Sequence, residues 1–312
     1  GVMLHVRLVR FDLSVDPAQS RLIELDEPER VISACQELIS QVQSHEAHPV
    51  VAIGLVMPWH PVDHRFAGAF PEQLAKTISS SCGLPVRCLA DAQALALSEA
   101  FCGMGRKFRD FLVVYIHEAI SLGAILGAEL HEPGIAGKSA AAPGLSILEP
   151  GGPRLPGMVP GSASACLSRA AIDRDLSQLG LAEDHHQTYL ILQRELRRAV
   201  APSGTAPDTP DLRPLVTTLA RRCGLLLVNL AAAYAPDRIF LYSPLNELGP
   251  VFTDSLQANI LDLVPRESRD YFQKLVVLSG DWISAMTSGA AKATFDTWLS
   301  TLPRTGGTLE VS

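Results

Sequence analysis

The sequence predicts an α/β protein built from two lobes. Short apolar runs of strand length alternate with segments of helical periodicity in both halves of the chain. The 312 residues are enough for two lobes of ordinary size. With 47% hydrophobic and 19% charged residues, the chain can bury a sizeable core. We expect a smaller lobe over residues 1–89, a larger lobe over 90–290, and a helix end with a tail over 291–312.

The smaller lobe is expected to begin with two paired strands and a helix. Residues 4–13 alternate apolar and polar side chains, and residues 21–25 provide a partner strand after an Asp-Pro turn at 16–17. Residues 26–29 resemble a capping box, which predicts a helix start. Apolar side chains then recur at helical spacing, at Val31, Ile32, Cys35, Leu38, Ile39 and Val42.

A second strand–helix–strand unit follows. Residues 50–56 form a short apolar run, which is typical of a buried strand. A helix is predicted around residues 71–80 and another strand over 85–89. Asp91 is expected to begin a helix over 92–101. Two glycines shortly after residue 101 are expected to end it.

The larger lobe should contain a hairpin and a long loop. Strands are predicted over residues 111–116 and 120–126, joined by the short turn 117–119. Residues 132–162 are rich in proline and glycine, which indicates a long, shaped loop. Residues 201–210 have the composition of a mobile excursion.

The remaining elements of the larger lobe continue the alternation. Helices are predicted over 163–179, 212–234 and 283–299, and strands over 238–242 and 274–278. No tandem repeat is evident.

Composition narrows the range of partners and compartments. The formal net charge of −7 argues against nucleic-acid binding by this chain alone. No run of about 18 apolar residues predicts a membrane span, and the first residues do not resemble a secretory leader. The cysteines are scattered without a C-x-x-C pair, so we expect small buried thiols in a reducing, cytoplasmic compartment. They are Cys35, Cys82, Cys88, Cys102, Cys166 and Cys223.

Four segments occur in an order that resembles one protein family. They are residues 84–96, 111–130, 223–241 and 288–291. Together they resemble the ROK family, which holds bacterial sugar kinases and sugar-sensing repressors. The resemblance spans nearly the whole chain and implies an actin-like ATPase (ribonuclease H-like) fold, with pairing into a homodimer through the larger lobe.

The resemblance places a candidate general base at Asp91, where a strand ends and a helix begins. A carboxylate there could take the proton of a sugar hydroxyl or hydrogen-bond the hydroxyl without chemistry. An aspartate at this position also caps a helix, so both interpretations remain open. The two asparagines that flank this aspartate in the family are Ala90 and Gln93 here.

The other sugar ligands of the family are altered. Its Glu-x-Gly-His segment aligns with residues 142–145, which are apolar at both ligand positions. His60, His117 and Ser146 are candidate substitutes from neighbouring loops, although each is also an ordinary loop residue. The candidate ligand-binding set is therefore His60, Asp91, Gln93, His117 and Ser146.

The nucleotide and metal elements implied by the family are also altered. Of its glycine-rich second phosphate loop, aligned with residues 117–123, only Gly123 is kept, and Glu118 adds a negative charge. The adenine-side glycines align with residues 242–244, Tyr-Ser-Pro. The zinc-binding cysteines fall in 151–165, which contains none. We therefore predict neither a nucleotide cofactor nor a bound metal.

These residues favour a non-catalytic role for the chain. We expect a ligand-sensing module for a sugar or related metabolite bound between the lobes, either in a transcriptional regulator whose DNA-binding part lies outside this chain or as a pseudokinase. The alternative is an ATP-dependent sugar kinase that uses Asp91 as its base. A structural homodimer without a ligand is a third possibility.

Overall fold

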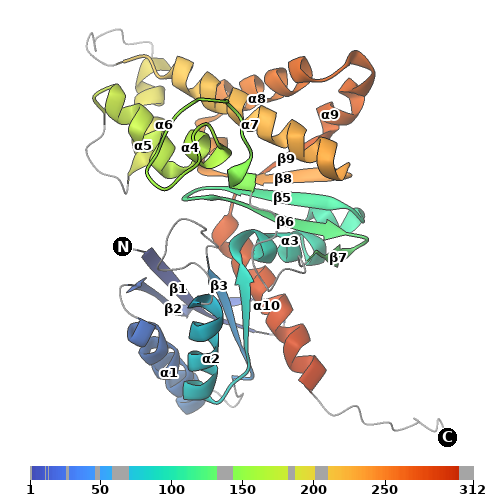
Figure 1. The fold of residues 1–312 in the computed structure, drawn as a ribbon. Coiled ribbons are helices and arrows are strands. Elements are labelled where there is room, and N and C mark those ends of the chain that lie inside the picture. The colour runs from blue at the N-terminus through green and yellow to red at the C-terminus, as the bar shows by residue number, and fades with distance from the viewer. Residues whose placement is uncertain are drawn as a thin grey trace, which may run out of the picture.

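The computed structural model describes most of the chain. It covers residues 2–10, 12, 14–25, 28–45, 50–57, 70–131, 143–181, 187–200 and 210–301. Figure 1 shows two α/β lobes, with helices α3 (Asp91–Phe101) and α10 (Trp282–Thr301) in the layer between them. The predicted α/β class and two-lobed arrangement are confirmed.

The larger lobe is organised on a five-stranded mixed sheet in the order β7-β6-β5-β8-β9. Strand β5 pairs antiparallel with β6 and parallel with β8, and β8 pairs parallel with β9. The strands are β5 (Phe111–Ile116), β6 (Ile120–Leu126), β7 (Glu129–Leu130), β8 (Arg238–Tyr242) and β9 (Val276–Ser279).

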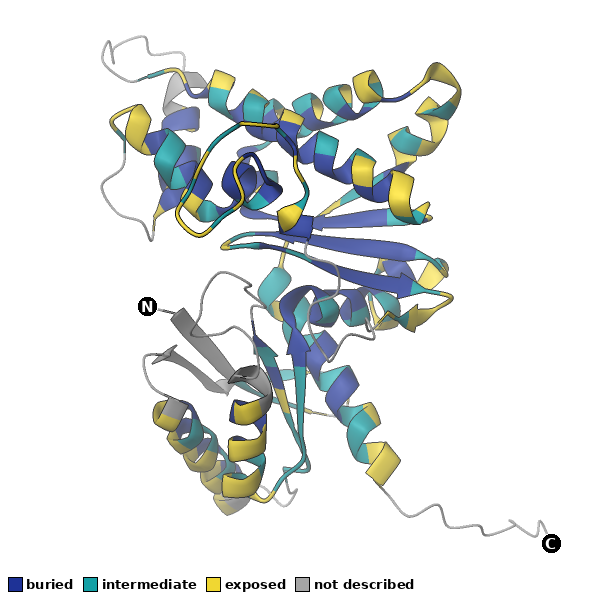
Figure 2. Ribbon diagram, in the orientation of Figure 1, coloured by how far each residue is buried: buried dark blue, intermediate teal, exposed yellow. Residues whose placement is uncertain are grey.

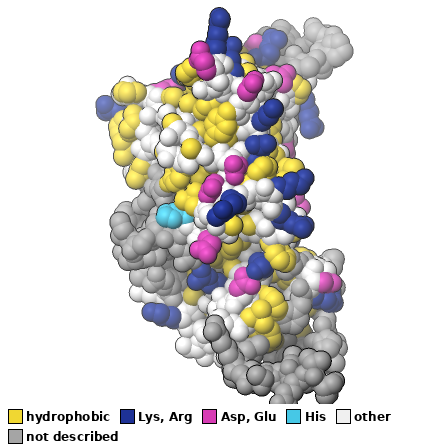
Figure 3. Space-filling view, turned by 90° about the vertical axis from the view of Figure 1, so that its right-hand side faces the viewer, with side chains coloured by type: hydrophobic (Ala, Val, Ile, Leu, Met, Phe, Trp, Pro, Cys, Tyr) yellow, Lys and Arg dark blue, Asp and Glu magenta, His cyan; other side chains and the backbone are white. Residues whose placement is uncertain are grey.

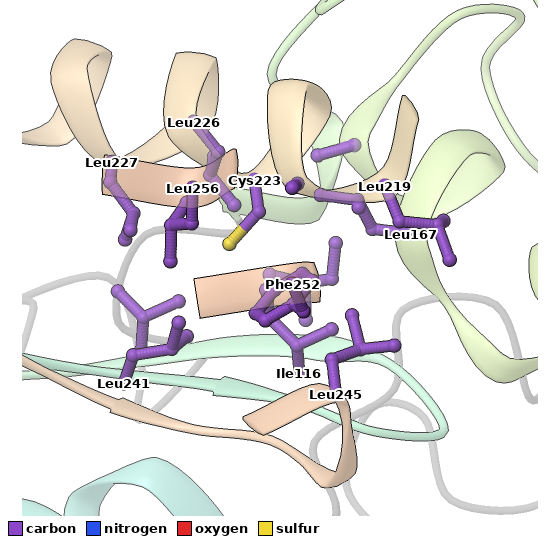
Figure 4. Close-up of a cluster of buried hydrophobic side chains, with 14 of the residues drawn as sticks. Ile116, Leu167, Leu219, Cys223, Leu226, Leu227, Leu241, Leu245, Phe252 and Leu256 are labelled. Carbon is purple, nitrogen blue, oxygen red and sulfur yellow. The ribbon is translucent and has the colours of Figure 1, made fainter. Parts of the chain in front are cut away.

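One face of this sheet carries the main core of the protein. Every residue of β5 is buried, because helices cover both faces of the sheet (Figure 2). Side chains from β5 and β8 meet Cys223 and Leu226 of α7 (Arg213–Tyr234) and Phe252 of α8 (Pro250–Leu263) in a hydrophobic cluster (Figure 4). The covering helices are α4 (Ala163–Leu167), α5 (Arg169–Gln178), α6 (Thr188–Val200), α7 (Arg213–Tyr234), α8 (Pro250–Leu263) and α9 (Arg269–Leu275).

Among the described residues, α7 alone is long and apolar enough to cross a bilayer. More than half of its most apolar stretch is buried, and its buried side chains belong to the core cluster of the sheet. A buried core helix passes the same length and composition test.

The other face of the sheet rests on α3, and α10 packs against the far side of α3. Glycines make these contacts close. A methyl group at Gly123 of β6 would overlap the carbonyl of Ala92, and one at Gly289 of α10 would overlap the carbonyl of Ala94. Gly54 in turn lies against α10, where a side chain would meet Thr294. These contacts fix α3 between the sheet and α10.

The smaller lobe has two pairs of strands and two helices. Strands β1 (Val2–Val9) and β2 (Val15–Leu25) are antiparallel, and β3 (Ile53–Met57) and β4 (Val86–Ala90) are parallel. Helix α1 (Pro28–His45) turns the predicted apolar stripe inward, since Val31, Leu38 and Val42 are buried. It packs against helix α2 (Phe70–Cys82).

Some predicted boundaries were wrong. The Asp16-Pro17 pair lies inside β2, because the chain turns earlier, where the Arg10 N–H donates to the Ser14 carbonyl. The predicted helix over 163–179 is two helices, since Ser168 caps the second. The strand predicted at 50–56 begins at Ile53, and that predicted at 274–278 begins at Val276. Part of the 26–29 capping box and most of 201–210 lie outside the described residues.

Candidate functional site

The candidate site lies where several parallel strands end. The carboxyl end of β4 leads directly into α3 at Asp91, and that of β5 leads into the turn at His117. In open α/β sheets, ligands bind outside the carboxyl ends of the strands. The β5–β6 turn and the start of α3 therefore form the candidate site.

Asp91 is the first residue of α3 and is only 6% exposed. The Ser121 hydroxyl donates to its Oδ1 at 2.6 Å, and the Ala92 N–H donates to the same oxygen at 2.7 Å. The carboxylate thus helps to complete the helix start and also binds a strand of the larger lobe. The N-cap of α3 is Ala90, so Asp91 is the first helical residue and not the cap that the sequence allowed. Its role as a site residue stays a prediction.

Gln93 lies on the same helical turn. Its side-chain Oε1 accepts the Ala90 N–H at 3.1 Å, so the carbonyl group of the amide satisfies a backbone donor at the helix start. This hydrogen bond gives Gln93 a capping role besides the ligand role predicted for it.

His117 is enclosed by aromatic rings. Its imidazole stacks on Tyr115 at 5.8 Å and on Tyr189 of α6 at 5.4 Å between ring centroids, and Trp282 of α10 lies 5.8 Å away. Burial lowers the pKa of His117 below its ordinary value, and the Glu118 carboxylate opposes that shift only in part. The neutral ring is therefore favoured, and the cluster joins the turn to α10.

The β5–β6 turn is also fixed by ionic and backbone contacts. The Arg169 Nε donates to Glu118 Oε1 at 2.6 Å, and the Arg169 Nη1 donates to Asp173 at 2.9 Å. The backbone N–H of Arg169 and the hydroxyl of Tyr189 both donate to the His117 carbonyl, at 2.9 and 3.1 Å. Side chains therefore pack around this turn and hold it against α5 and α6.

The two remaining predicted site residues are not brought to Asp91 by a described contact. Ser146 lies in the loop before α4, where its N–H donates to the Pro143 carbonyl and its own carbonyl accepts the Ala163 N–H. His60 lies outside the described residues. Asp91 and Gln93 share one helical turn, whereas His117 lies at the end of β5.

Sequence reasoning did not single out Ser121, Arg169, Tyr189 or Trp282. For Ser121 a signal was available. Residues 121 and 123 of one strand point to the same face, and a glycine inside a strand, such as Gly123, often marks a close approach of another backbone. The other three contact the turn from helices distant in sequence, which no local pattern could indicate.

An ion-pair network flanks residues 151–165, where the family's zinc loop was expected. Arg222 of α7 donates to both carboxylate oxygens of Glu149 at 3.1 Å, and to Asp175 at 3.4 Å. Its Nη1 also lies 3.4 Å from the Cys166 carbonyl. Among the described residues, no group of three or more His, Cys, Asp or Glu side chains could hold a metal ion.

Residues 242–244, which align with the adenine-side glycines of the family, make hydrogen bonds within the protein. The Tyr242 hydroxyl donates to Glu99 Oε1 at 2.7 Å, and the Ser243 hydroxyl oxygen accepts the Leu245 N–H at 3.2 Å. Asn246 donates to the carbonyls of Leu241 and Ser279, which joins the ends of β8 and β9.

Two lobes around a helical layer, with a mixed sheet and polar groups at the strand ends, define an α/β protein of the actin-like ATPase fold. Residues 26–292 match the sequence profile of the ROK family, and the chain belongs to this family. A search of curated protein sequences found no match.

Solved structures agree with this fold. A ROK hexokinase from Thermus thermophilus is 22% identical, with a TM-score of 0.65 over 89% of this chain and 91% of its own. A ROK transcriptional regulator homologous to the E. coli MLC protein is 16% identical, with a TM-score of 0.73 over 96% and 77%. A ROK glucokinase from Streptomyces griseus, solved with glucose and AMPPNP, is 18% identical, with a TM-score of 0.68 over 94% and 96%.

Proposed function

We propose that this chain is a ligand-sensing ROK module without kinase activity, either part of a transcriptional regulator or a pseudokinase. The observation that carries the proposal is the packed β5–β6 turn. His117 is stacked among aromatic rings, and Glu118 is paired with Arg169. Side chains occupy this turn in place of the glycines whose open backbone donors hold a polyphosphate in the family.

Asp91 supports a sugar or related metabolite as the ligand. A buried carboxylate at the start of a helix can accept a hydrogen bond from a ligand hydroxyl, and such a bond to a charged group contributes about 1.5–3 kcal/mol. The glucokinase from Streptomyces griseus was solved with glucose.

Separate titrations with nucleotide and sugar test the proposal. We expect glucose or another hexose to raise the melting temperature by mass action. We expect Mg-AMPPNP at millimolar concentration to leave it unchanged and to give no heat of binding in calorimetry. Saturable binding of Mg-AMPPNP would overturn the proposal. A hexose panel without any response would reject the sugar ligand and favour a structural homodimer.

An ATP-dependent sugar kinase is the second candidate, and the position of Asp91 favours it. The carboxylate lies at the junction of β4 and α3, and two of the three structural relatives described above are sugar kinases. A coupled assay with Mg-ATP and a hexose panel separates the two candidates. Turnover in the wild type that disappears in Asp91→Asn would establish the kinase.

The assembly, partners and compartment belong to the same proposal. We expect a homodimer in the cytoplasm that does not bind nucleic acid through this chain alone. All six cysteines are free thiols, as a reducing compartment favours. On the face in Figure 3, Lys and Arg side chains are interspersed with Asp and Glu instead of forming a broad basic surface. Light scattering after gel filtration tests whether the protein is a dimer. A DNA mobility-shift assay tests whether this chain alone binds nucleic acid.

A further inference from the structure

The hydrogen bond between Ser121 and Asp91 joins the two halves of the candidate site. Ser121 belongs to β6 of the larger sheet, whereas Asp91 begins α3 at the end of a strand of the smaller lobe. The two residues are 30 positions apart in the chain. We propose that Ser121 is a positioning residue, whose hydroxyl holds the Asp91 carboxylate in the orientation that receives a hydroxyl group of the ligand. This inference rests on the proposed sugar-sensing function.

The approach of β6 to α3 dictates this contact. Gly123 lies so close to Ala92 that a methyl group there would overlap the Ala92 carbonyl. Residues two apart on a strand point to the same face, so Ser121 also faces α3. Ser121 lies two residues before Gly123 on β6, and Asp91 lies one residue before Ala92 on α3. The Ser121 side chain is therefore long enough to reach the Asp91 carboxylate. Gly123 allows β6 to approach α3 closely, and at this distance the Ser121 hydroxyl reaches Asp91.

The bond restricts how Asp91 can turn. Its Oδ1 accepts two donors, the Ser121 hydroxyl and the Ala92 N–H, from two different elements. Two donors that meet one carboxylate oxygen restrict the side-chain rotamer. A group that is already oriented loses less conformational entropy when a ligand binds, so the fixed carboxylate should bind a ligand hydroxyl more tightly than a rotating one.

The residue opposite Ser121 is a second side chain that carries a hydroxyl group. Tyr115 is the register partner of Ser121 across β5 and β6. Burial, together with the charge of Asp91, raises the pKa of Tyr115 above its ordinary value, so the phenol stays protonated. A neutral phenol can donate and accept hydrogen bonds, as the hydroxyls of a sugar also do. The ligand in this inference is the polyhydroxylated molecule that the proposed function names.

The first experiment measures glucose affinity in the full chain by calorimetry. Ser121→Ala removes the hydroxyl, and Ser121→Thr keeps it. We expect the alanine variant to bind glucose about tenfold more weakly and the threonine variant to stay within about threefold of wild type. Ser79→Ala is the matched control, because the Ser79 hydroxyl makes a 2.7 Å bond to the Leu84 carbonyl in the smaller lobe, away from the site. It should leave the affinity unchanged.

Equal affinity of the alanine variant and the wild type, or tighter binding by the alanine variant, would overturn the inference. A loss of affinity that Ser121→Thr does not restore would also do so, because the effect would then come from altered packing. Urea unfolding of each variant shows whether it is folded at the titration temperature.

A second readout does not depend on the ligand, so it separates this inference from the proposed function. Crystal structures of the Ser121→Ala and Ser121→Thr variants show the Asp91 rotamer directly. We expect Asp91 to change or divide its rotamer in the alanine variant only. If wild type binds no hexose, the proposed function fails, and the rotamer alone decides whether Ser121 positions Asp91. An unchanged rotamer in Ser121→Ala would reject the positioning role.

Discussion

Glu99 is a carboxylate buried beneath the sheet, far along α3 from the candidate site, and Tyr242 stabilises it. The Tyr242 hydroxyl donates to Glu99 Oε1 at 2.7 Å, and the Gly105 N–H donates to Oε2 at 3.3 Å. Burial raises the pKa of Tyr242, and Glu99 raises it further, so the phenol keeps the proton that it donates. A buried acceptor without such a donor would be strongly destabilising.

Removal of this hydroxyl should therefore destabilise the fold. We expect Tyr242→Phe to lower the free energy of unfolding by about 1–3 kcal/mol, because it leaves a carboxylate oxygen buried without its donor. Tyr271→Phe is the matched control. The Tyr271 hydroxyl donates to the Pro236 carbonyl at 2.7 Å, but the residue is 39% exposed and water can replace the bond. Urea unfolding measures both, and equal losses would contradict the prediction.

At the scale of elements, glycines determine how closely α3 and α10 approach. Gly289 of α10 lies against the Ala94 carbonyl of α3, where a methyl group would overlap it. Gly224 of α7 is also inside a helix, but a methyl group there would meet Ile260 and Asn259 of α8 at ordinary contact distances of 3.4 and 3.5 Å. The two glycines share a helical conformation and differ in the space around them.

The two alanine substitutions should change stability in opposite directions. Helix propensity alone favours alanine over glycine by about 1 kcal/mol. We expect Gly224→Ala to stabilise the protein or leave it unchanged. Gly289→Ala should destabilise it by about 1–3 kcal/mol, because overpacking against backbone outweighs propensity. Thermal unfolding checks both signs, and stabilisation by Gly289→Ala would show that α10 does not pack on α3 this closely.

Strands and helices were predictable from the sequence where a single local pattern of apolar residues defined them. The boundaries of β5 and β6 agree with the prediction, because strands covered on both faces form apolar runs that end at a polar turn. The start of β2 was not predictable from turn chemistry, since its pairing with β1, with Val15 opposite Val9, carries the strand through an Asp-Pro pair. The break at Ser168 interrupts a continuous apolar periodicity, which concealed it.

The candidate site was predictable only in part, because some of its contacts join segments that are distant in the sequence. A strand end followed by a helix located Asp91 from local pattern alone. Its bond to Ser121 depends on the register of β6 against α3, and the rings around His117 come from α6 and α10. Such contacts between distant segments exist only once the lobes have assembled.

For the whole molecule, the Arg222 network makes stability depend on pH. The two hydrogen bonds from Arg222 hold the pKa of Glu149 below its ordinary value. A carboxylate with a lowered folded pKa contributes stability that is fully present above its unfolded pKa, near 4.3, and is lost as the pH falls through the folded value. Protonation of Glu149 at low pH should therefore weaken this network, which holds the loop before α4 against α7, and so contribute to unfolding by acid.

Replacement of Arg222 tests this dependence. We expect Arg222→Met to lower the free energy of unfolding by about 1–3 kcal/mol at pH 7, because Glu149 and Asp175 lose a shared, largely buried partner. Glu149 keeps its ion pair with Arg221, and Asp175 keeps its ion pair with Arg174, which limits the loss. The difference in unfolding free energy between wild type and variant should narrow between about pH 5 and pH 3, because protonation of Glu149 removes from the wild type the ion pair with Arg222 that the variant lacks. Arg213→Ala, which removes an exposed pair with Asp211, should change stability little at any pH. Urea unfolding at each pH measures this difference, and a difference that stays constant down to about pH 3 would show that Arg222 acts through packing alone.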